Sequence, residues 1–184
     1  MKKVLVNGEE ISEEAIAFEL ARLMHFYKSH GMPEANLKAN LESLKEKARE
    51  QAVGAKLLLD EASRLHETVT AAEIDQEVAK VVAHLGGEEN FRQALLAQGL
   101  DEERFRQDLE KGVRVNHLVE KACAGVPEPT EAEIVAFYQA SSDPESAETL
   151  VDAHDRIRDL LRHEARGRAM EIYVEELREK ATIE

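Results

Sequence analysis

The 184-residue sequence predicts an all-α fold, and three observations lead to this expectation. Ala, Leu, Glu, Lys and Arg dominate the chain, and these are the strongest helix formers. Aromatic residues make up only 4% of the chain, and Trp is absent. Apolar residues recur at steps of three and four, which is the spacing of one face of an amphipathic helix. Because hydrophobic residues account for 43% of the sequence, the helices can bury a core.

The chain begins with a short β-prone run and a first helix. Residues 3–6 (KVLV) precede an Asn-Gly pair, which is typical of tight turns. Ser12 can cap a helix, because its side chain can accept a hydrogen bond from an N–H group of the first turn. Gly31 is expected to end this helix, and Pro33 is expected at the first position of the next one.

A long helix is predicted in the N-terminal half of the chain. Apolar residues at steps of three and four run without a break from Pro33 to Leu65. At 1.5 Å per residue, such a helix would be about 45–50 Å long. Since a compact bundle of this size does not need so long a helix, the sequence predicts an elongated molecule.

Capping signals divide the middle of the chain into shorter helices. Residues 70–73 (TAAE) and 130–133 (TEAE) both match the capping box, in which a Thr hydroxyl and a Glu carboxylate satisfy backbone N–H groups. Gly99 is expected as a left-handed helix end, and Asp101 as the cap of the helix that follows. Gly112 lies inside that helix and suggests close packing there.

The chain is expected to form a single helical module, residues 1–184, in three parts. Residues 1–126 are the predicted N-terminal helical core. Residues 127–143 are predicted to contain a linker, a short helix and a break. Residues 144–184 are predicted to form a long helix that returns to the core and a short terminal strand.

Two further predictions concern the start of this final helix and the terminal strand. Asp143 is expected to cap the final helix, with Pro144 at its first position. Residues 181–184 are expected to pair with residues 4–6, giving one small two-stranded β pairing of the termini.

Charge and cysteine content narrow the range of partners. Thirty-eight acidic residues against 24 basic ones give a net charge of −14, which disfavours binding to the phosphates of a nucleic acid. The single cysteine, Cys123, excludes an intramolecular disulfide and a multi-cysteine metal site. The sequence as given shows neither the apolar run of a signal peptide nor a membrane-spanning segment, so no membrane insertion is predicted.

The sequence carries none of the common catalytic, cofactor or metal-binding motifs. The sequence contains no phosphate-binding loop of either common glycine-rich type and no G-x-S-x-G nucleophile motif. His163 and Glu164 match the start of a zinc-protease motif, but Gly167 stands where the second histidine is needed. No catalytic residue, cofactor or metal site is therefore predicted.

Two local clusters allow more than one interpretation. Five arginines and two acidic residues give residues 156–168 a net charge of +3, which could bind an acidic partner. A solvated helix face with ion pairs is the favoured alternative. A second, apolar cluster near the end of the first helix contains the candidate binding residues Leu23, Met24, Phe26, Tyr27 and Met32. Methionine-rich surfaces suit promiscuous binding, while burial in the core is the alternative for most of the five.

The order of several segments resembles one family, the SurA-type chaperones. VLVNGEEIS resembles their opening strand and capped helix, and residues 69–81 and 90–122 resemble their helical core. The marks of that core are Thr70, Gly99, Asp101, Phe105 and Arg106. VPEPTEAEIVAFYQ resembles the linker and short helix before the family's parvulin-type prolyl isomerase domain. YVEELREKATIE resembles the helix and strand that return to the core after it.

The resemblance implies a chaperone core without its isomerase domain. That domain, roughly a hundred residues in the family, would be inserted at YQASSDPESAETL, where this chain passes almost directly into the next helix. No counterpart of the parvulin active-site segments is found in the sequence, so no enzyme is expected. An isomerase domain outside the given sequence is a further, less favoured alternative.

The implied function is non-catalytic, holdase-like binding of apolar segments in unfolded, partly folded or newly exported polypeptides. The five apolar residues named above are then the client-binding candidates. The alternative is an assembly adaptor that binds one folded partner or forms a homodimer. The family resemblance suggests the periplasm or cell envelope if a leader was removed, whereas the chain as read would be cytoplasmic, and the compartment stays open.

Overall fold

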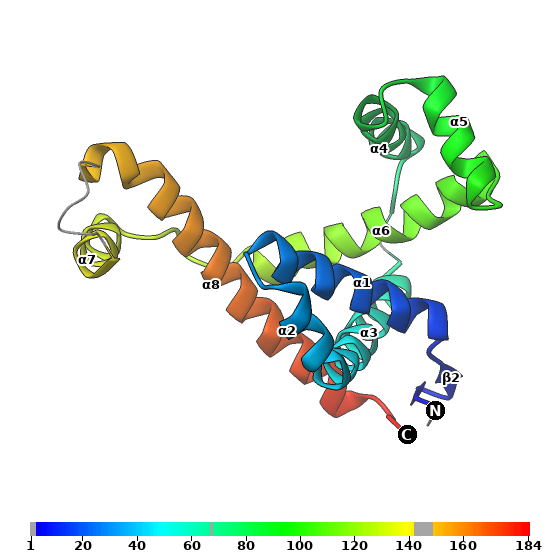
Figure 1. Ribbon diagram of the computed structural model, residues 1–184, viewed down its shortest axis with the longest axis horizontal. Coiled ribbons are helices and arrows are strands. Elements are labelled where there is room, and N and C mark those ends of the chain that lie inside the picture. The colour runs from blue at the N-terminus through cyan, green and yellow to red at the C-terminus, as the bar shows by residue number, and fades with distance from the viewer. Residues whose placement is uncertain (1–2, 67, 142–148) are drawn as a thin grey trace. The chain divides into compact units, whose positions relative to one another are not determined.

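The computed structural model describes residues 3–66, 68–141 and 149–184, which form eight helices and a small sheet (Figure 1). In chain order the elements are β1 (Leu5–Val6), β2 (Glu9–Glu10), α1 (Glu13–Ser29), α2 (Glu34–Ala39), α3 (Leu41–Arg64), α4 (Ala71–His84), α5 (Glu88–Ala97), α6 (Glu102–Cys123), α7 (Glu131–Ser141) and α8 (Leu150–Lys180). The prediction of an all-α fold with a small β pairing is confirmed.

The chain divides into two compact units. The first extends to Leu118 and includes Glu176–Glu184, and the second is Val119–Glu175. The boundaries between the units fall inside α6 and α8 and not in loops. The first unit combines two segments of the chain, and the second is one continuous segment. The expectation that residues 1–184 act as one module stays a prediction.

A small sheet brings the two ends of the described chain together. Asn7 and Gly8 both have positive φ, which is the conformation of a tight hairpin turn, and β1 and β2 pair antiparallel across it. The C-terminal residues add a third segment, with Val6 opposite Ile183. The N–H of Leu5 donates to the carbonyl of Glu184 at 2.9 Å, and the Glu184 N–H donates back at 3.0 Å. The predicted terminal pairing is confirmed, whereas β2, composed of two glutamates, was not predicted.

The hairpin is joined to α3 by burial and by charge. Val6 is fully buried, and Lys56 of α3 lies between the carboxylates of Glu9 and Asp60, with Nζ–O distances of 2.6 and 2.5 Å. Partial burial lowers the pKa of Lys56, but its hydrogen bonds to Asp60 and Glu9 outweigh this effect and leave that pKa above its ordinary value. The lysine therefore stays charged and holds the hairpin against the helix.

Helix α1 begins and ends close to where the sequence predicts. The Ser12 hydroxyl accepts a hydrogen bond from the Ala15 N–H at 3.1 Å. At the other end Gly31 has φ +83°, and the Met32 N–H donates to the Tyr27 carbonyl at 2.9 Å, which is the Schellman pattern. Pro33 lies at the cap of α2, one position before the first helical residue.

The prediction of one continuous helix from Pro33 to Leu65 is wrong. The chain forms α2 and α3, with Asn40 between them at φ −100° and ψ 12°. The side-chain amide of Asn40 donates to the Asn36 carbonyl at 2.8 Å, and an Asn side chain that bonds local backbone competes with helix continuation. At 1.5 Å per residue, α3 alone is about 36 Å long.

Helices α1 and α3 pack together, and α2 contacts α1 (Figure 1). The buried residues of α3 include three alanines, Ala48, Ala52 and Ala62, together with larger side chains. The buried apolar residues of these helices are Leu23, Leu37, Leu44, Ala48, Ala52, Val53, Leu57 and Ala62. The four-residue steps from Leu44 through Ala48 to Ala52 are part of the apolar spacing seen in the sequence.

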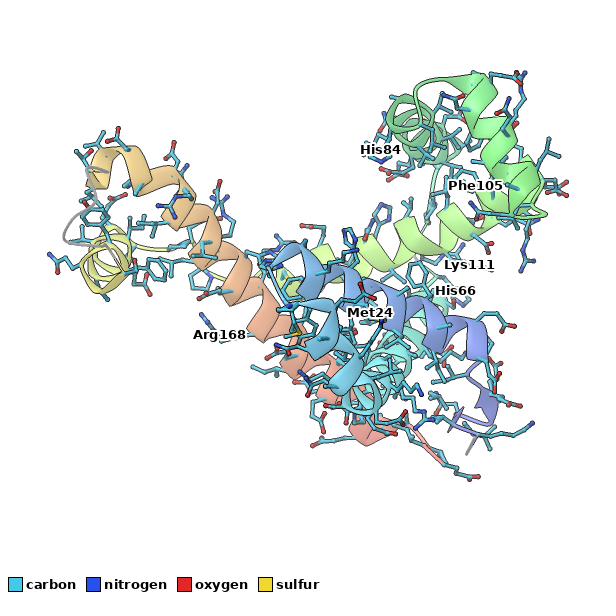
Figure 2. All side chains as sticks on the ribbon, viewed as in Figure 1. Met24, His66, His84, Phe105, Lys111 and Arg168 are labelled. Carbon is cyan, nitrogen blue, oxygen red and sulfur yellow. The ribbon has the colours of Figure 1, made fainter. Side chains whose placement is uncertain are left out.

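A second cluster is formed by α4, α5 and α6. Its buried residues are Val78, Phe91 and Leu95, and the rings of Phe91 and Phe105 meet edge to face with 5.2 Å between centroids (Phe105 labelled in Figure 2). Gly99 has φ +66°, as predicted, and this lets Leu100 turn back and pack against the cluster.

Polar contacts fix the beginnings of α4 and α6. Thr70 and Glu73 form the predicted capping box, and the Glu73 carboxylate also lies 2.8 Å from Nε2 of His117 on α6. Hydrogen bonds from the Thr70 hydroxyl and backbone, and then from His117, lower the pKa of Glu73. Asp101 caps α6 by accepting a hydrogen bond from the Arg104 N–H at 2.7 Å. The close packing expected at Gly112 is wrong, since a Cβ there would meet nothing within 4 Å.

The second unit contains α7 and the first part of α8. Ile134 of α7 is buried with Ala153 and Ile157 of α8. The predicted start of the last helix at Asp143 and Pro144 lies outside the described residues. The described helix begins at Leu150, where the Thr149 hydroxyl accepts a hydrogen bond from the Asp152 N–H at 3.3 Å and donates one to its carboxylate at 2.7 Å. This Thr-x-x-Asp cap was not recognised in the sequence. Across the parts of the chain that are described, no helix combines the length and apolar character that crossing a bilayer requires.

Deleting residues 181–184 should lower the melting temperature. The deletion removes the backbone hydrogen bonds to β1 and exposes Val6, which should cost about 1–3 kcal/mol in the free energy of unfolding. Thermal unfolding followed by circular dichroism measures the change. Thr182→Ala is the matched control, because it keeps every backbone bond of the terminal strand, and an unchanged melting temperature in the deletion variant would show that the strand adds no stability.

His154 should titrate above its ordinary pKa. Its Nε2 lies 2.9 Å from Glu131 at the start of α7, and its Nδ1 lies 3.2 Å from Asp155. Hydrogen bonds to Glu131 and then to Asp155 raise the pKa of His154 above 6.5. Because the folded-state pKa is raised, the contribution to stability is fully present below pH ~6.5 and is lost as the pH rises through the folded-state pKa.

Proton NMR of the His154 ring measures this pKa. Glu131→Gln should bring the midpoint down toward the ordinary value, while Asp159→Asn, which removes a partner of Arg162 instead, should leave it in place. A midpoint at or below that of the urea-unfolded chain would contradict the contact.

Candidate functional site

The first candidate surface is a shallow groove between the C-terminal half of α1 and the N-terminal half of α3. It has a volume of about 500 Å³. We call it the aromatic groove, and its lining residues are Arg22, Leu23, Phe26, Tyr27, Lys47, Glu50 and Gln51. The groove exists because α1 and α3 pack through their buried faces and leave the side chains at the border of that contact open to solvent.

The structure brings three of the five candidate binding residues to this groove. Leu23 is buried and forms part of its floor, Tyr27 is half-buried, and 52% of Phe26 is exposed. Met24 and Met32 are half-buried and do not line the groove (Met24 labelled in Figure 2). Burial therefore accounts fully for only one of the five, and client binding by the others stays a prediction.

Phe26 is held in its exposed position by its neighbours. Its ring meets the Tyr27 ring edge to face at 5.5 Å and stacks at a tilt against the His30 imidazole, with 4.2 Å between centroids. His30 is fixed in turn by its own Nδ1, which lies 2.8 Å from the Phe26 carbonyl. The exposed aromatic surface is thus preorganised, which limits the side-chain entropy lost on binding.

Tyr27 and Lys47 form the polar side of the aromatic groove. The Lys47 ammonium lies 3.3 Å from the Tyr27 hydroxyl and 5.9 Å from the centre of its ring. We interpret the contact as a hydrogen bond to the hydroxyl, since the ring distance is at the limit for a cation–π interaction. Lys47 is exposed and carries its charge at the edge of an apolar surface.

A second pocket follows on the same α1–α3 border, toward the start of α1. It has a volume of about 420 Å³, and its larger apolar side chains are Ile11, Phe18 and Leu59. Phe18 is 68% exposed. Glu19 of this pocket and Arg22 of the aromatic groove are joined by an ion pair with an Nη2–Oε2 distance of 2.8 Å. Both pockets lie along the contact between α1 and α3, which we call the seam, and this ion pair lies on α1 between them.

Sequence reasoning missed Phe18. Phe18 and Phe26 are eight residues apart on α1, so they are displaced by about 12 Å along the helix and share roughly one side of it. This spacing is visible in the sequence. However, the same spacing is found for residues that are buried in a helical core. The sequence does not show that α3 covers the neighbouring face of α1 and leaves Phe18 exposed.

The second unit has a groove of its own, with a volume of about 660 Å³. It lies between the Pro127–Pro129 segment and α8, where Leu161, Ala165, Ala169 and the exposed Ile172 follow at helical spacing. Arg168 lines the same groove, and Figure 2 shows its side chain extending away from α8.

The arginines of α8 are mostly engaged in ion pairs, which confirms the favoured interpretation of a solvated, paired face. Arg162 contacts both Glu128 and Asp159, and Arg166 contacts Glu120. Arg158 pairs with Asp155, and Arg168 lies 3.8 Å from Glu164. The guanidinium of Arg162 lowers the pKa of Glu128 and keeps that carboxylate charged.

Among the residues that the structure describes, the histidines, the cysteine and the carboxylates do not assemble into a metal site. Cys123 is buried, with its thiol 3.9 Å from the Arg166 carbonyl. Among the described side chains, no three His, Cys, Asp or Glu residues are grouped so that they could hold a metal ion. The arrangement of the described grooves suits contact with apolar side chains.

Comparison with known families agrees with the family resemblance that the order of the sequence segments indicates. The model of a family described as the SurA-like N-terminal domain matches residues 3–119, more than half of the chain. The match includes α1 and α3 and therefore both pockets of their seam. Residues 142–148, between the described end of α7 and Thr149, are too few to hold the isomerase domain of SurA-type chaperones. A search of curated proteins found no match. The chain belongs to the SurA-like N-terminal domain family, which is associated with chaperones.

Proposed function

We propose that this protein is a non-catalytic, holdase-like chaperone that binds apolar segments of unfolded or newly exported polypeptides. The observation that carries the proposal is the exposure of Phe18 and Phe26 on one helical seam. Single exposed apolar residues are common on folded proteins, but two large exposed rings on one helix, each bordering a pocket, offer a client two apolar contacts.

The pockets are shallow and open, which supports binding to client segments of many different sequences. Shallow, open grooves accept side chains of different size, because they impose no closed shape on the ligand. Half-buried Met24 and Met32 lie outside the two pockets, on and just after the same helix, and methionine adapts to different neighbours through its unbranched side chain. An unfolded client offers apolar residues in no fixed order, so an adaptable surface suits it.

The charge of the protein supports the holding step. The net charge of −14 makes complexes with an unfolded client repel one another, which disfavours aggregation. Membership of a chaperone-associated family agrees with this role. No chemical step is needed, since the client leaves by dissociation and folds or is passed on.

Light scattering of a chemically denatured model protein, diluted into ATP-free buffer with and without equimolar chain, tests the proposal. The double variant Phe18→Ser/Phe26→Ser should need about thirtyfold more chain for the same suppression, because each ring contributes on the order of 1 kcal/mol when a client covers it. Leu96→Ser is the matched control. It removes an apolar residue that is 77% exposed on α5, away from the seam, and should leave suppression unchanged.

The outcomes separate the chaperone from an adaptor. Suppression of scattering by the native chain and its loss in the double variant support the proposal. If several denatured clients scatter equally with and without the chain, the holdase function is wrong, and a single stoichiometric folded partner becomes the function to seek. Circular dichroism of each variant establishes that the helices are intact.

A further inference from the structure

We propose that the aromatic groove selects client segments in which an aromatic side chain stands next to an aspartate or glutamate, and that Lys47 binds this carboxylate. The inference rests on the proposed chaperone function and adds the class of segment that the groove prefers. Two independent observations carry it, one on the distribution of acidic residues and one on the ion pairs of α3.

Acidic residues are absent from the segment that supplies the α1 side of the groove. Residues 20–33 contain neither Asp nor Glu, and no other stretch of this very acidic sequence is as long without one. The same stretch carries Arg22 and Lys28 as well as the aromatic pair Phe26 and Tyr27. The end of α1 therefore presents apolar surface with a positive local charge, in contrast to the net charge of −14 of the whole chain. Such a surface complements an acidic, aromatic segment.

Lys47 is the exception among the cations of α3. Four of the five basic side chains of this helix form ion pairs with a carboxylate, namely Lys45, Arg49, Lys56 and Arg64. Lys47 instead donates to the uncharged hydroxyl of Tyr27, and within the described chain no carboxylate lies within 4.0 Å of its ammonium. In a protein with 38 acidic residues, this leaves one cation at the groove available for a carboxylate from outside.

The position of Lys47 links the charge to the aromatic surface. Its ammonium lies beside Tyr27, whose ring meets Phe26 edge to face, and all three residues line the same groove. A client ring placed against Phe26 would bring the next residue of the client to the Lys47 side. A carboxylate there gains an ion pair, whereas a lysine meets a like charge.

Glu50 lines the groove as well and acts in the opposite direction. It lies three residues after Lys47 on α3 without approaching its ammonium within 4.0 Å. Its carboxylate repels an acidic segment, so Lys47 and Glu50 should affect the preference with opposite signs. Variants of these two residues therefore test the inference, because loss of Lys47 should weaken binding of an acidic segment and loss of Glu50 should strengthen it.

Fluorescence anisotropy with three labelled peptides, identical except for Asp, Asn or Lys next to a single Phe, measures the preference. We expect the Asp peptide to bind about two- to fivefold more tightly than the Asn peptide at low salt, since exposed ion pairs are weak. Lys47→Gln should abolish the difference, Lys47→Glu should reverse it, and Glu50→Gln should enlarge it. At ~1 M salt the preference should disappear.

Lys45→Gln is the matched control, because Lys45 is a paired cation of the same helix that does not line the groove. It should leave the preference unchanged. If the peptides bind with equal affinity, or if Lys47→Gln and Lys45→Gln act alike, the inferred selectivity is wrong while the chaperone function stands. If none of the peptides binds and denatured clients still aggregate, both are wrong.

Discussion

The packing of α1 against α3 is the contact on which the rest of the first unit depends. Small residues, Ala48 and Ala52, lie buried on the contacting face of α3, and small side chains at a helix–helix contact let two helices approach closely. Burial of this face fixes which side of α1 remains outside. Phe18 and Phe26 lie at the border of the contact, so the interaction that stabilises the helices also creates the exposed seam.

The same pattern of capping hydrogen bonds stabilises the starts of α4, α7 and α8. Thr70, Thr130 and Thr149 each accept a hydrogen bond from a backbone N–H three residues later and donate to the carboxylate of that residue. These bonds satisfy N–H groups that would otherwise lack a partner at a helix start. The chain thus needs few long-range contacts to define its helices, and the grooves are formed by how those helices pack.

Apart from the pairing of the two terminal segments, the features that the sequence predicts correctly are those determined within a few residues. The caps at Ser12 and Asp101 and the helix end at Gly99 follow from neighbouring side chains and from the freedom of glycine at positive φ. The break at Asn40 was missed because the flanking apolar spacing continues across it, and a single amide decides the outcome. The role of Phe18 was missed because it depends on which face α3 covers, which is a property of the packed molecule.

The terminal sheet has a consequence for the order of folding during synthesis. The backbone bonds between Leu5 and Glu184 close a loop of almost the entire chain, and contacts so distant in sequence form late. On the ribosome, the β1–β2 hairpin and α1–α3 emerge first and can pack long before residue 184 is made. One edge of β1 must stay open throughout this period, and open strand edges invite pairing with other chains. Rapid docking of Val6 onto α3 would hold β1 against its own helix during this period, until residues 181–184 arrive to pair with it.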